Sequence, residues 1–285
     1  MDNHLLIFGM GYSASHLATK LRAQGWRVTG TRRTADGDNI AFDDDAAVRS
    51  AIASASHILS SVPPERNGDD PVLARYGDAI RSAGASWLGY LSSTGVYGDA
   101  GGAWVDESAA VQGRRAGRNA ADLAWQALDS RLRIFRLPGI YGPGRSAIER
   151  VAEGKAHRID LPEQIFSRIH VEDIAGGVIA SFNGPSGVYN LSDDLPCGQN
   201  AVIEYAAMLL GQEPPPMQSL DEAQLSPMAL AFYAENRRVA NRRAKRLLGW
   251  RLAYPNYCDG LRACMEISRP AMASTAPAAA SADQT

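Results

Sequence analysis

Short apolar runs alternate with stretches of helical periodicity over the first 140 residues of the chain. The strand-like runs are Leu5–Phe8, Arg27–Thr31, His57–Ser60, Trp87–Ser92 and Leu132–Leu137. Between the first two, residues 13–24 place Ala14, Leu17, Ala18 and Leu21 on one helical face, and Gly25 is a typical helix stop. This alternation predicts βαβ units with right-handed crossovers, and therefore an α/β fold built on a doubly wound parallel sheet.

The alternation weakens after about Gly142. A helix near Val171–Phe182 and a strand near Val188–Leu191 are expected to complete the sheet. We therefore predict a sheet domain over 1–143 and a smaller C-terminal lobe over 144–267, with 171–192 returning to the sheet. Residues 268–285 are nearly all Ala, Ser, Thr and Pro, which predicts a disordered tail.

Charge and composition exclude several classes of function. The formal net charge of −2 gives no electrostatic reason to expect nucleic acid or an anionic membrane as a partner. Residues 237–246 hold six basic side chains, but a solvated helix face explains them, since the rest of the chain offsets their charge. No apolar run approaches the ~20 residues needed to span a bilayer, and no basic region precedes Leu5. Three cysteines form neither a disulfide framework nor a zinc pattern, so we expect a cytoplasmic protein without a metal.

A glycine motif joins the first predicted strand to the first predicted helix. It reads Gly9-Met10-Gly11-Tyr12-Ser13-Ala14. Gly9 permits a tight turn, Gly11 allows a pyrophosphate to approach the backbone, and Ala14 permits close packing of helix on strand. Free amides at the helix start, with the Ser13 hydroxyl, would face the phosphates. The motif predicts a dinucleotide site of the Rossmann type, and we assign Tyr12 and the strand-end residue Ser60 to it as well.

The end of the second strand predicts which dinucleotide is bound. An NAD site usually has an acidic residue here, but this chain has Arg32 and Arg33. A guanidinium at this place can pair with a 2′-phosphate, so we expect NADP in preference to NAD. The alternative is that both arginines are exposed loop residues with no ligand.

Further motifs follow in a fixed order. They are Leu91-Ser92-Ser93-Thr94-Gly95-Val96-Tyr97-Gly98, Arg136-Leu137-Pro138-Gly139-Ile140-Tyr141-Gly142-Pro143-Gly144, Arg168-Ile169-His170-Val171-Glu172-Asp173-Ile174-Ala175 and Gly187-Val188-Tyr189-Asn190-Leu191. With the glycine loop, they resemble the extended short-chain dehydrogenase/reductases, the NAD-dependent epimerase/dehydratase family, over about residues 4–266. The glycine loop is shorter than the family's usual form, which is typical of the atypical branch. The resemblance also implies that a homodimer packed through helices of the sheet domain is a common arrangement.

The resemblance implies catalytic roles that this chain fills only in part. The substrate-orienting Ser/Thr corresponds to Thr94, with Ser93 beside it. The family's Tyr-x-x-x-Lys pair corresponds to Arg114 and Arg118, and arginine cannot exchange a proton near neutral pH. Arg118 could still bind the nicotinamide ribose. Tyr97 is the leading substitute proton donor, although a packing tyrosine in the loop after the strand is the alternative.

Three residues are candidates for substrate binding in the cleft between the lobes: Tyr141, Arg145 and His170. Arg145 could bind a phosphate or carboxylate, whereas His170 is more often a helix-start residue than a catalytic base. Two hypotheses follow. The first is an NAD(P)-binding oxidoreductase or epimerase-like enzyme that acts on a small carbonyl or sugar-nucleotide substrate. The second is a non-catalytic NADP(H) sensor or regulatory module.

Overall fold

A single parallel sheet of seven strands organises the chain. The computed structural model describes residues 3–65 and 68–274. The strands of this sheet are β1 (His4–Phe8), β2 (Arg27–Arg32), β3 (Asn39–Ala41), β4 (His57–Ser60), β5 (Trp87–Ser93), β7 (Leu132–Leu137) and β11 (Gly187–Asn190). Their order is β11-β7-β5-β4-β1-β2-β3, and every neighbouring pair is parallel. The predicted doubly wound α/β sheet is confirmed.

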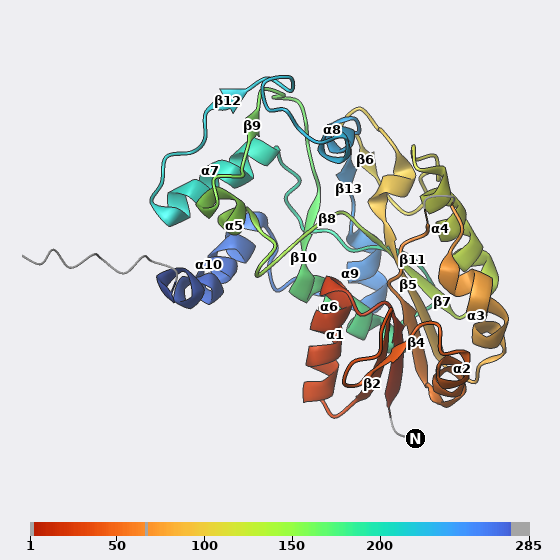
Figure 1. Cartoon of the computed structure of the whole chain (residues 1–285). Coiled ribbons are helices and arrows are strands. Elements are labelled where there is room, and N and C mark those ends of the chain that lie inside the picture. The colour runs from red at the N-terminus through yellow and green to blue at the C-terminus, as the bar shows by residue number, and fades with distance from the viewer. Residues whose placement is uncertain (1–2, 66–67, 275–285) are drawn as a thin grey trace, which may run out of the picture.

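Helices cover both faces of this sheet (Figure 1). On one face lie α1 (Tyr12–Ala23), α6 (Val171–Ala180) and α9 (Arg242–Leu248), and on the other α2 (Asp45–Ser54), α3 (Pro71–Ser82) and α4 (Ala116–Leu128). The packing of strand β1 explains why Leu5–Phe8 are all apolar. Leu5 and Ile7 pack in the core beneath α1, whereas Leu6 and Phe8 pack in the core beneath α2 and α3. A strand buried on both faces is apolar at every position.

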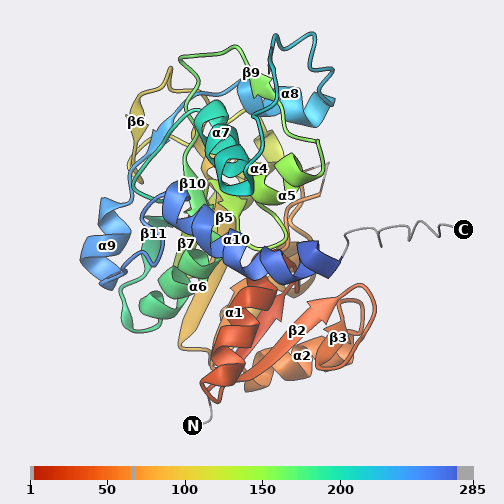
Figure 2. The same cartoon turned by 90° about the vertical axis from the view of Figure 1, so that its left-hand side faces the viewer.

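A second, smaller core lies beside the sheet domain, and Figure 2 shows its helices on the same side as α1 and α6. It consists of α5 (Ala147–Ala152), α7 (Gln199–Leu210) and α10 (Tyr257–Ser274), with the short pair β9 (Arg158–Ile159) and β12 (Met217–Gln218). Segments 171–190 and 242–248 pack in the sheet domain, although the sequence assigned the latter to the lobe. The predicted tail over 268–285 overlaps α10, which continues to Ser274, and 275–285 lie outside the described residues.

The remaining elements are short. They are the 3-10 turns η1 (Thr94–Tyr97) and η2 (Ser181–Asn183), the strands β6 (Trp104–Val105), β8 (Gly139–Tyr141), β10 (Arg168–His170) and β13 (Arg238–Val239), and the helix α8 (Pro227–Tyr233). β8 pairs with β10, and β6 pairs with β13, so segments far apart in sequence meet above the carboxyl ends of β5 and β7. No helix within the described ranges is long and apolar enough to cross a membrane.

Candidate active site

The glycine loop lies between β1 and α1, where the carboxyl ends of the parallel strands meet. Gly9 has a φ of +83°, and a Cβ there would lie 2.8 Å from a side-chain carbon of Val62, so both the conformation and the packing require glycine. Thr31 on β2 fixes the loop, because its Oγ1 accepts from the Gly9 amide at 3.0 Å. Ser61 closes it from the other side by donating to the Gly9 carbonyl at 2.6 Å.

Gly11 differs from Gly9, because nothing in the protein requires a glycine there. Its φ is −88°, and no atom of residues 3–65 and 68–274 lies within 4 Å of where a Cβ would be. The space above it is open cavity, at the start of a helix with no acidic residue in its first turn. A phosphate group lying on the amides of this helix start would use that space. The loop therefore fits a bound dinucleotide.

A cavity of about 890 Å³, here called the outer cavity, extends from the glycine loop over the ends of β2 and β4. Its lining includes Gly9, Gly11, Arg32, Arg33 and Ser61. Arg32 forms an ion pair with Asp36 at 2.9 Å. Arg33 is exposed and has no ion pair among the residues that the structure describes. Arg33 is therefore the guanidinium available to a ligand.

Ser60 is placed differently from the prediction. It is fully buried, and its Oγ has no hydrogen-bond partner in the described part of the chain. Its neighbour Ser61 lines the cavities instead. Ser60 is the last residue of the central strand β4 and is enclosed by the sheet, whereas Ser61 follows the strand and reaches its carboxyl edge. Ala14 is also buried, which agrees with the packing role that the motif gave it.

A second cavity, the central cavity of about 300 Å³, adjoins the outer one and shares Gly11, Ser61 and Pro63 with it. Tyr12 and Arg145 line it, and the Arg145 guanidinium lies 5.6 Å from the centre of the Tyr12 ring. The Tyr12 hydroxyl donates to the Pro143 carbonyl at 3.0 Å. Burial raises the pKa of Tyr12 to about 12, so it remains protonated at neutral pH.

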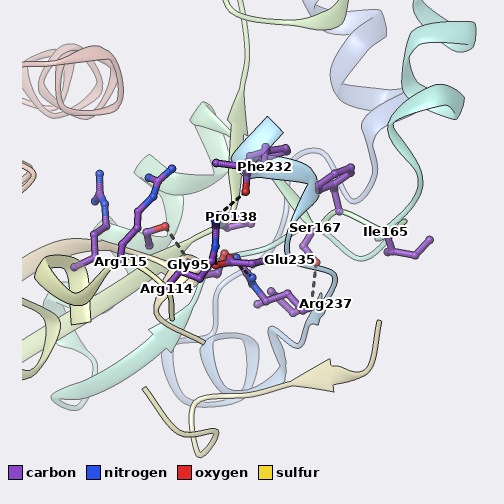
Figure 3. A pocket seen from close by; sticks show the side chains of 16 residues that line it. Gly95, Arg114, Arg115, Pro138, Ile165, Ser167, Phe232, Glu235 and Arg237 are labelled. Carbon is purple, nitrogen blue, oxygen red and sulfur yellow. Dashed lines mark hydrogen bonds and ion pairs between the residues drawn. The ribbon is translucent and has the colours of Figure 1, made fainter. Parts of the chain in front are cut away.

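A third cavity of about 140 Å³, the arginine cavity, shares Ser93, Arg115, Arg118 and Pro138 with the central one (Figure 3). Ser93 and Thr94 enter it from the end of β5. The start of α4 supplies the two shared arginines and Arg114, and the wall opposite comes from the chain around 165–167 and from α8 with the loop that follows it. The three cavities thus form one continuous series along the edge of the sheet.

Arg114, which corresponds to the family tyrosine, holds two segments of the chain together. Its guanidinium donates to Glu235 at 3.1 Å and to the Ala231 carbonyl at 2.6 Å. Arg237 donates to the same carboxylate at 2.7 Å. Burial acts to raise the pKa of Glu235, but the hydrogen bonds from Arg237 and Arg114 outweigh it and hold that pKa below its usual value. Arg114 therefore ties the start of α4 to the segment that follows α8.

Arg118 is half-buried at the junction of the central and arginine cavities. Burial lowers its pKa from the usual arginine value, yet arginine remains charged near neutral pH. No hydrogen bond or ion pair of its guanidinium is found within 3–65 and 68–274. Arg118 lines the arginine cavity together with Ser93 and Thr94.

Besides Ser60 and Ala14, three predicted site residues are absent from the lining of these cavities. Tyr97 is 2% exposed, and its hydroxyl donates to Asn190 at 2.7 Å, so it does not fit the role of proton donor. Tyr141 is buried in the core of the small lobe. His170 begins α6, where its Nδ1 accepts from the Glu172 amide at 3.2 Å, and burial lowers its pKa to about 4. Neither Tyr141 nor His170 fits a substrate contact, because both are enclosed by protein.

Comparison with known proteins agrees with this architecture. No family model matches the chain. A conserved protein of unknown function from Silicibacter pomeroyi DSS has a solved structure with 44% identity and a TM-score of 0.82, covering 93% of this chain and 99% of that one. Among curated proteins, YeeZ of Escherichia coli K12 is 29% identical over 75% of this chain and 87% of its own length. A 3-diazoavenalumate denitrifying reductase from Streptomyces is 28% identical over 86% and 94%.

More distant solved structures define the fold. The human epimerase family protein SDR39U1, solved with NADPH, has 18% identity and a TM-score of 0.74, covering 92% of this chain and 99% of that one. A UDP-glucose 4-epimerase from Thermotoga maritima, solved with UDP-glucose, has 14% identity and a TM-score of 0.78, covering 94% and 99%. The chain therefore has the fold of the extended short-chain dehydrogenase/reductases, as its motifs indicated. It belongs to one family with the Silicibacter pomeroyi protein.

Proposed function

We propose that the protein is an NADP(H)-dependent oxidoreductase that acts on a small carbonyl-type substrate. The observation that carries this proposal is the continuous series of three cavities, which runs from the glycine loop past Ser93 and Thr94 to the arginine cavity. A dinucleotide on the glycine loop would lie in the outer and central cavities. A substrate in the arginine cavity would then meet the nicotinamide end of the dinucleotide.

The outer cavity favours NADP over NAD. Proteins with this fold have been solved with NADPH, as in human SDR39U1, and with NAD, as in a Thermus thermophilus UDP-glucose 4-epimerase. The fold alone therefore does not choose between the two. The end of β2 carries Arg32 and Arg33 where an NAD site usually has a carboxylate, and Arg33 has no ion pair in the described residues to compete with a 2′-phosphate.

The side chains in the arginine cavity can stabilise negative charge on a substrate oxygen. When bound, the nicotinamide exchanges a hydride with the substrate. The hydroxyls of Ser93 and Thr94 can donate to the carbonyl oxygen, and Arg118 provides a fixed positive charge beside them. Because arginine does not release its proton near neutral pH, the proton that completes the reaction comes from water. A reductase among the curated relatives supports redox chemistry on this scaffold.

The size of the arginine cavity favours a small substrate over a sugar nucleotide. Its volume of about 140 Å³ is below the ~300–1,000 Å³ of typical pockets for drug-sized ligands. Glu235, held by Arg114 and Arg237, closes one side of it. A nucleoside diphosphate sugar would require these ion pairs to open.

The second candidate function is a non-catalytic NADP(H) sensor. A specific observation favours it: no tyrosine of the described residues lines the arginine cavity, and the side chain at the family tyrosine position pairs with Glu235. Such a protein would bind the cofactor and turn nothing over. The two candidate functions therefore differ in whether the protein turns over a substrate.

The decisive experiment follows the loss of NADPH absorbance with a panel of small aldehydes and ketones. An oxidoreductase turns over at least one of them, and Thr94→Val lowers kcat about 10²-fold or more while NADPH affinity is retained. Thr19→Val, on the exposed face of α1, is the matched control and keeps wild-type activity. Cofactor binding without turnover across the panel would support the sensor instead. Full activity of Thr94→Val would show that the proposed substrate site is wrong.

A further inference from the structure

The arginine cavity carries an excess of positive charge. Four arginines line it against a single glutamate, which gives a formal charge of +3. Two of the four, Arg114 and Arg237, share Glu235. The other two, Arg115 and Arg118, form no ion pair within the part of the chain that the structure describes. Unpaired guanidinium groups that face a cavity are a binding site for an anion.

Arg115 is the arginine available to a substrate. It precedes α4 as the N-cap residue and is exposed, whereas Arg118 lies one turn further along, is half-buried, and in the proposed function provides positive charge beside Ser93 and Thr94. Both line the junction of the central and arginine cavities. In Figure 3, Arg115 lies on the side of the cavity opposite Ile165 and Arg237. Arg115 is therefore the exposed arginine of this cavity that no described carboxylate occupies, and it is available to an anion.

The opposite wall of the cavity is apolar and aromatic. Phe232 on α8 is 51% exposed, although it is a large hydrophobic side chain. Its ring stacks on Phe166 with 4.7 Å between ring centres and an interplanar angle of 18°. Ile165 continues this surface. One face of the stacked pair is therefore available to a flat apolar group, which aromatic rings bind by offset stacking.

We infer that the substrate is a small planar carboxylate, whose apolar body lies on Phe232 and whose carboxylate pairs with Arg115. This inference rests on the proposed function, because it assigns the chemical class of the substrate for the same site. A guanidinium can hold a carboxylate through two parallel hydrogen bonds, which fixes its orientation as well as its position. The carbonyl or equivalent acceptor group of the substrate would then lie near Thr94, at the junction with the central cavity.

Calorimetric titration of the protein saturated with NADP+ tests the inference. Benzoate and cinnamate are the probes, and benzamide and cinnamamide are their uncharged counterparts of similar shape. We expect each acid to bind at least 10-fold more tightly than its amide, because a hydrogen bond to a charged group is worth ~10- to 100-fold in affinity. Arg115→Gln should remove this preference, and Phe232→Ala should weaken the acid and the amide alike. Arg251→Gln, an exposed arginine that lines none of the three cavities, should change neither.

The possible results of this titration distinguish failure of the carboxylate inference from failure of the proposed NADP(H)-dependent function. If NADP+ itself does not bind, the proposed function fails. If NADP+ binds but acids and amides bind equally, or neither binds, the carboxylate inference is overturned and the cofactor site stands. If Arg115→Gln weakens NADP+ and leaves the preference for acids intact, Arg115 belongs to the cofactor site, and the inference is equally overturned.

Discussion

Replacing Asp122 by asparagine should destabilise the fold strongly, because Asp122 neutralises a buried arginine beneath the candidate site. The Asp122 side chain is fully buried, and Arg136 is 2% exposed. The Arg136 guanidinium donates to the two carboxylate oxygens of Asp122 at 2.7 and 3.1 Å, and the Ser92 hydroxyl donates to the same carboxylate at 2.5 Å. The network joins β5, α4 and β7, so it fixes the helix that carries Arg115 and Arg118.

The magnitude follows from burial. An exposed ion pair contributes about 0–1 kcal/mol, but removing one partner of a buried pair leaves an uncompensated charge and costs about 3–5 kcal/mol. We therefore expect Asp122→Asn to lower the free energy of unfolding by about 3–5 kcal/mol. Asp78→Asn is the control, because Asp78 pairs with Arg81 at the surface and its side chain is 97% exposed. That variant should change stability by less than about 0.5 kcal/mol.

Urea unfolding followed by tryptophan fluorescence measures both values, since Trp87 and Trp125 are buried. Asp122→Leu combined with Arg136→Met should be more stable than Asp122→Leu alone, because no charge remains buried. The reasoning is refuted if Asp122→Asn and the surface control lose the same stability. It is also refuted if the double variant is no more stable than the single one.

Three further predictions concern the cofactor site, the buried tyrosine Tyr97 and the pH dependence of stability. Gly11→Val should lower NADP+ affinity at least 10-fold, with a loss in the free energy of unfolding of about 1 kcal/mol or less by urea unfolding. Gly9→Ala should lower the free energy of unfolding by more, because the φ of +83° and the close packing at Gly9 exclude a side chain. Equal stability losses in the two variants would contradict this. Tyr97→Phe should leave turnover unchanged and cost about 1–2 kcal/mol of stability, because it removes the buried hydrogen bond to Asn190; a large loss of kcat would restore its catalytic role. Burial lowers the pKa of His57 from 6.5 to about 4, so between these pH values the unfolded chain binds more protons at His57 than the folded protein does. The free energy of unfolding should therefore fall by up to about 3 kcal/mol as pH falls from 6.5 to 4. His57→Phe should reduce the pH dependence of unfolding over that window relative to wild type, and parallel curves would refute the assignment.

The sequence predicted the central sheet well, because each strand is a short apolar run bounded by helical periodicity. Trp87–Ser92 and Leu132–Leu137 match β5 and β7 to within one residue. The edge strand β3 was missed, since it has three residues and none is fully buried. The placement of α9 was also missed, because a basic helix in a C-terminal segment gives no local sign that Ala244 and Leu248 pack against the sheet domain.

The candidate site was predicted where local motifs define it and missed where distant segments meet. Gly11 and Thr94 lie in motifs that fix their backbone position at strand ends. Phe232 and Glu235 come from a segment with no motif and reach the cavity only through tertiary packing against Phe166 and Arg114. Arg115 lies between the positions that correspond to the family's Tyr-x-x-x-Lys pair, and no motif marks it as a site residue. Its distance from any carboxylate could not be known without the fold.

Calorimetric titration of the purified protein with NADPH, NADP+, NADH and NAD+ in parallel tests the proposed cofactor site. We expect the two phosphorylated nucleotides to bind at least 10-fold more tightly than the other two. Arg32→Ala/Arg33→Ala should abolish that preference, whereas Arg251→Ala should preserve it. Absence of binding by all four nucleotides would contradict the dinucleotide site and would mean that the glycine loop is structural.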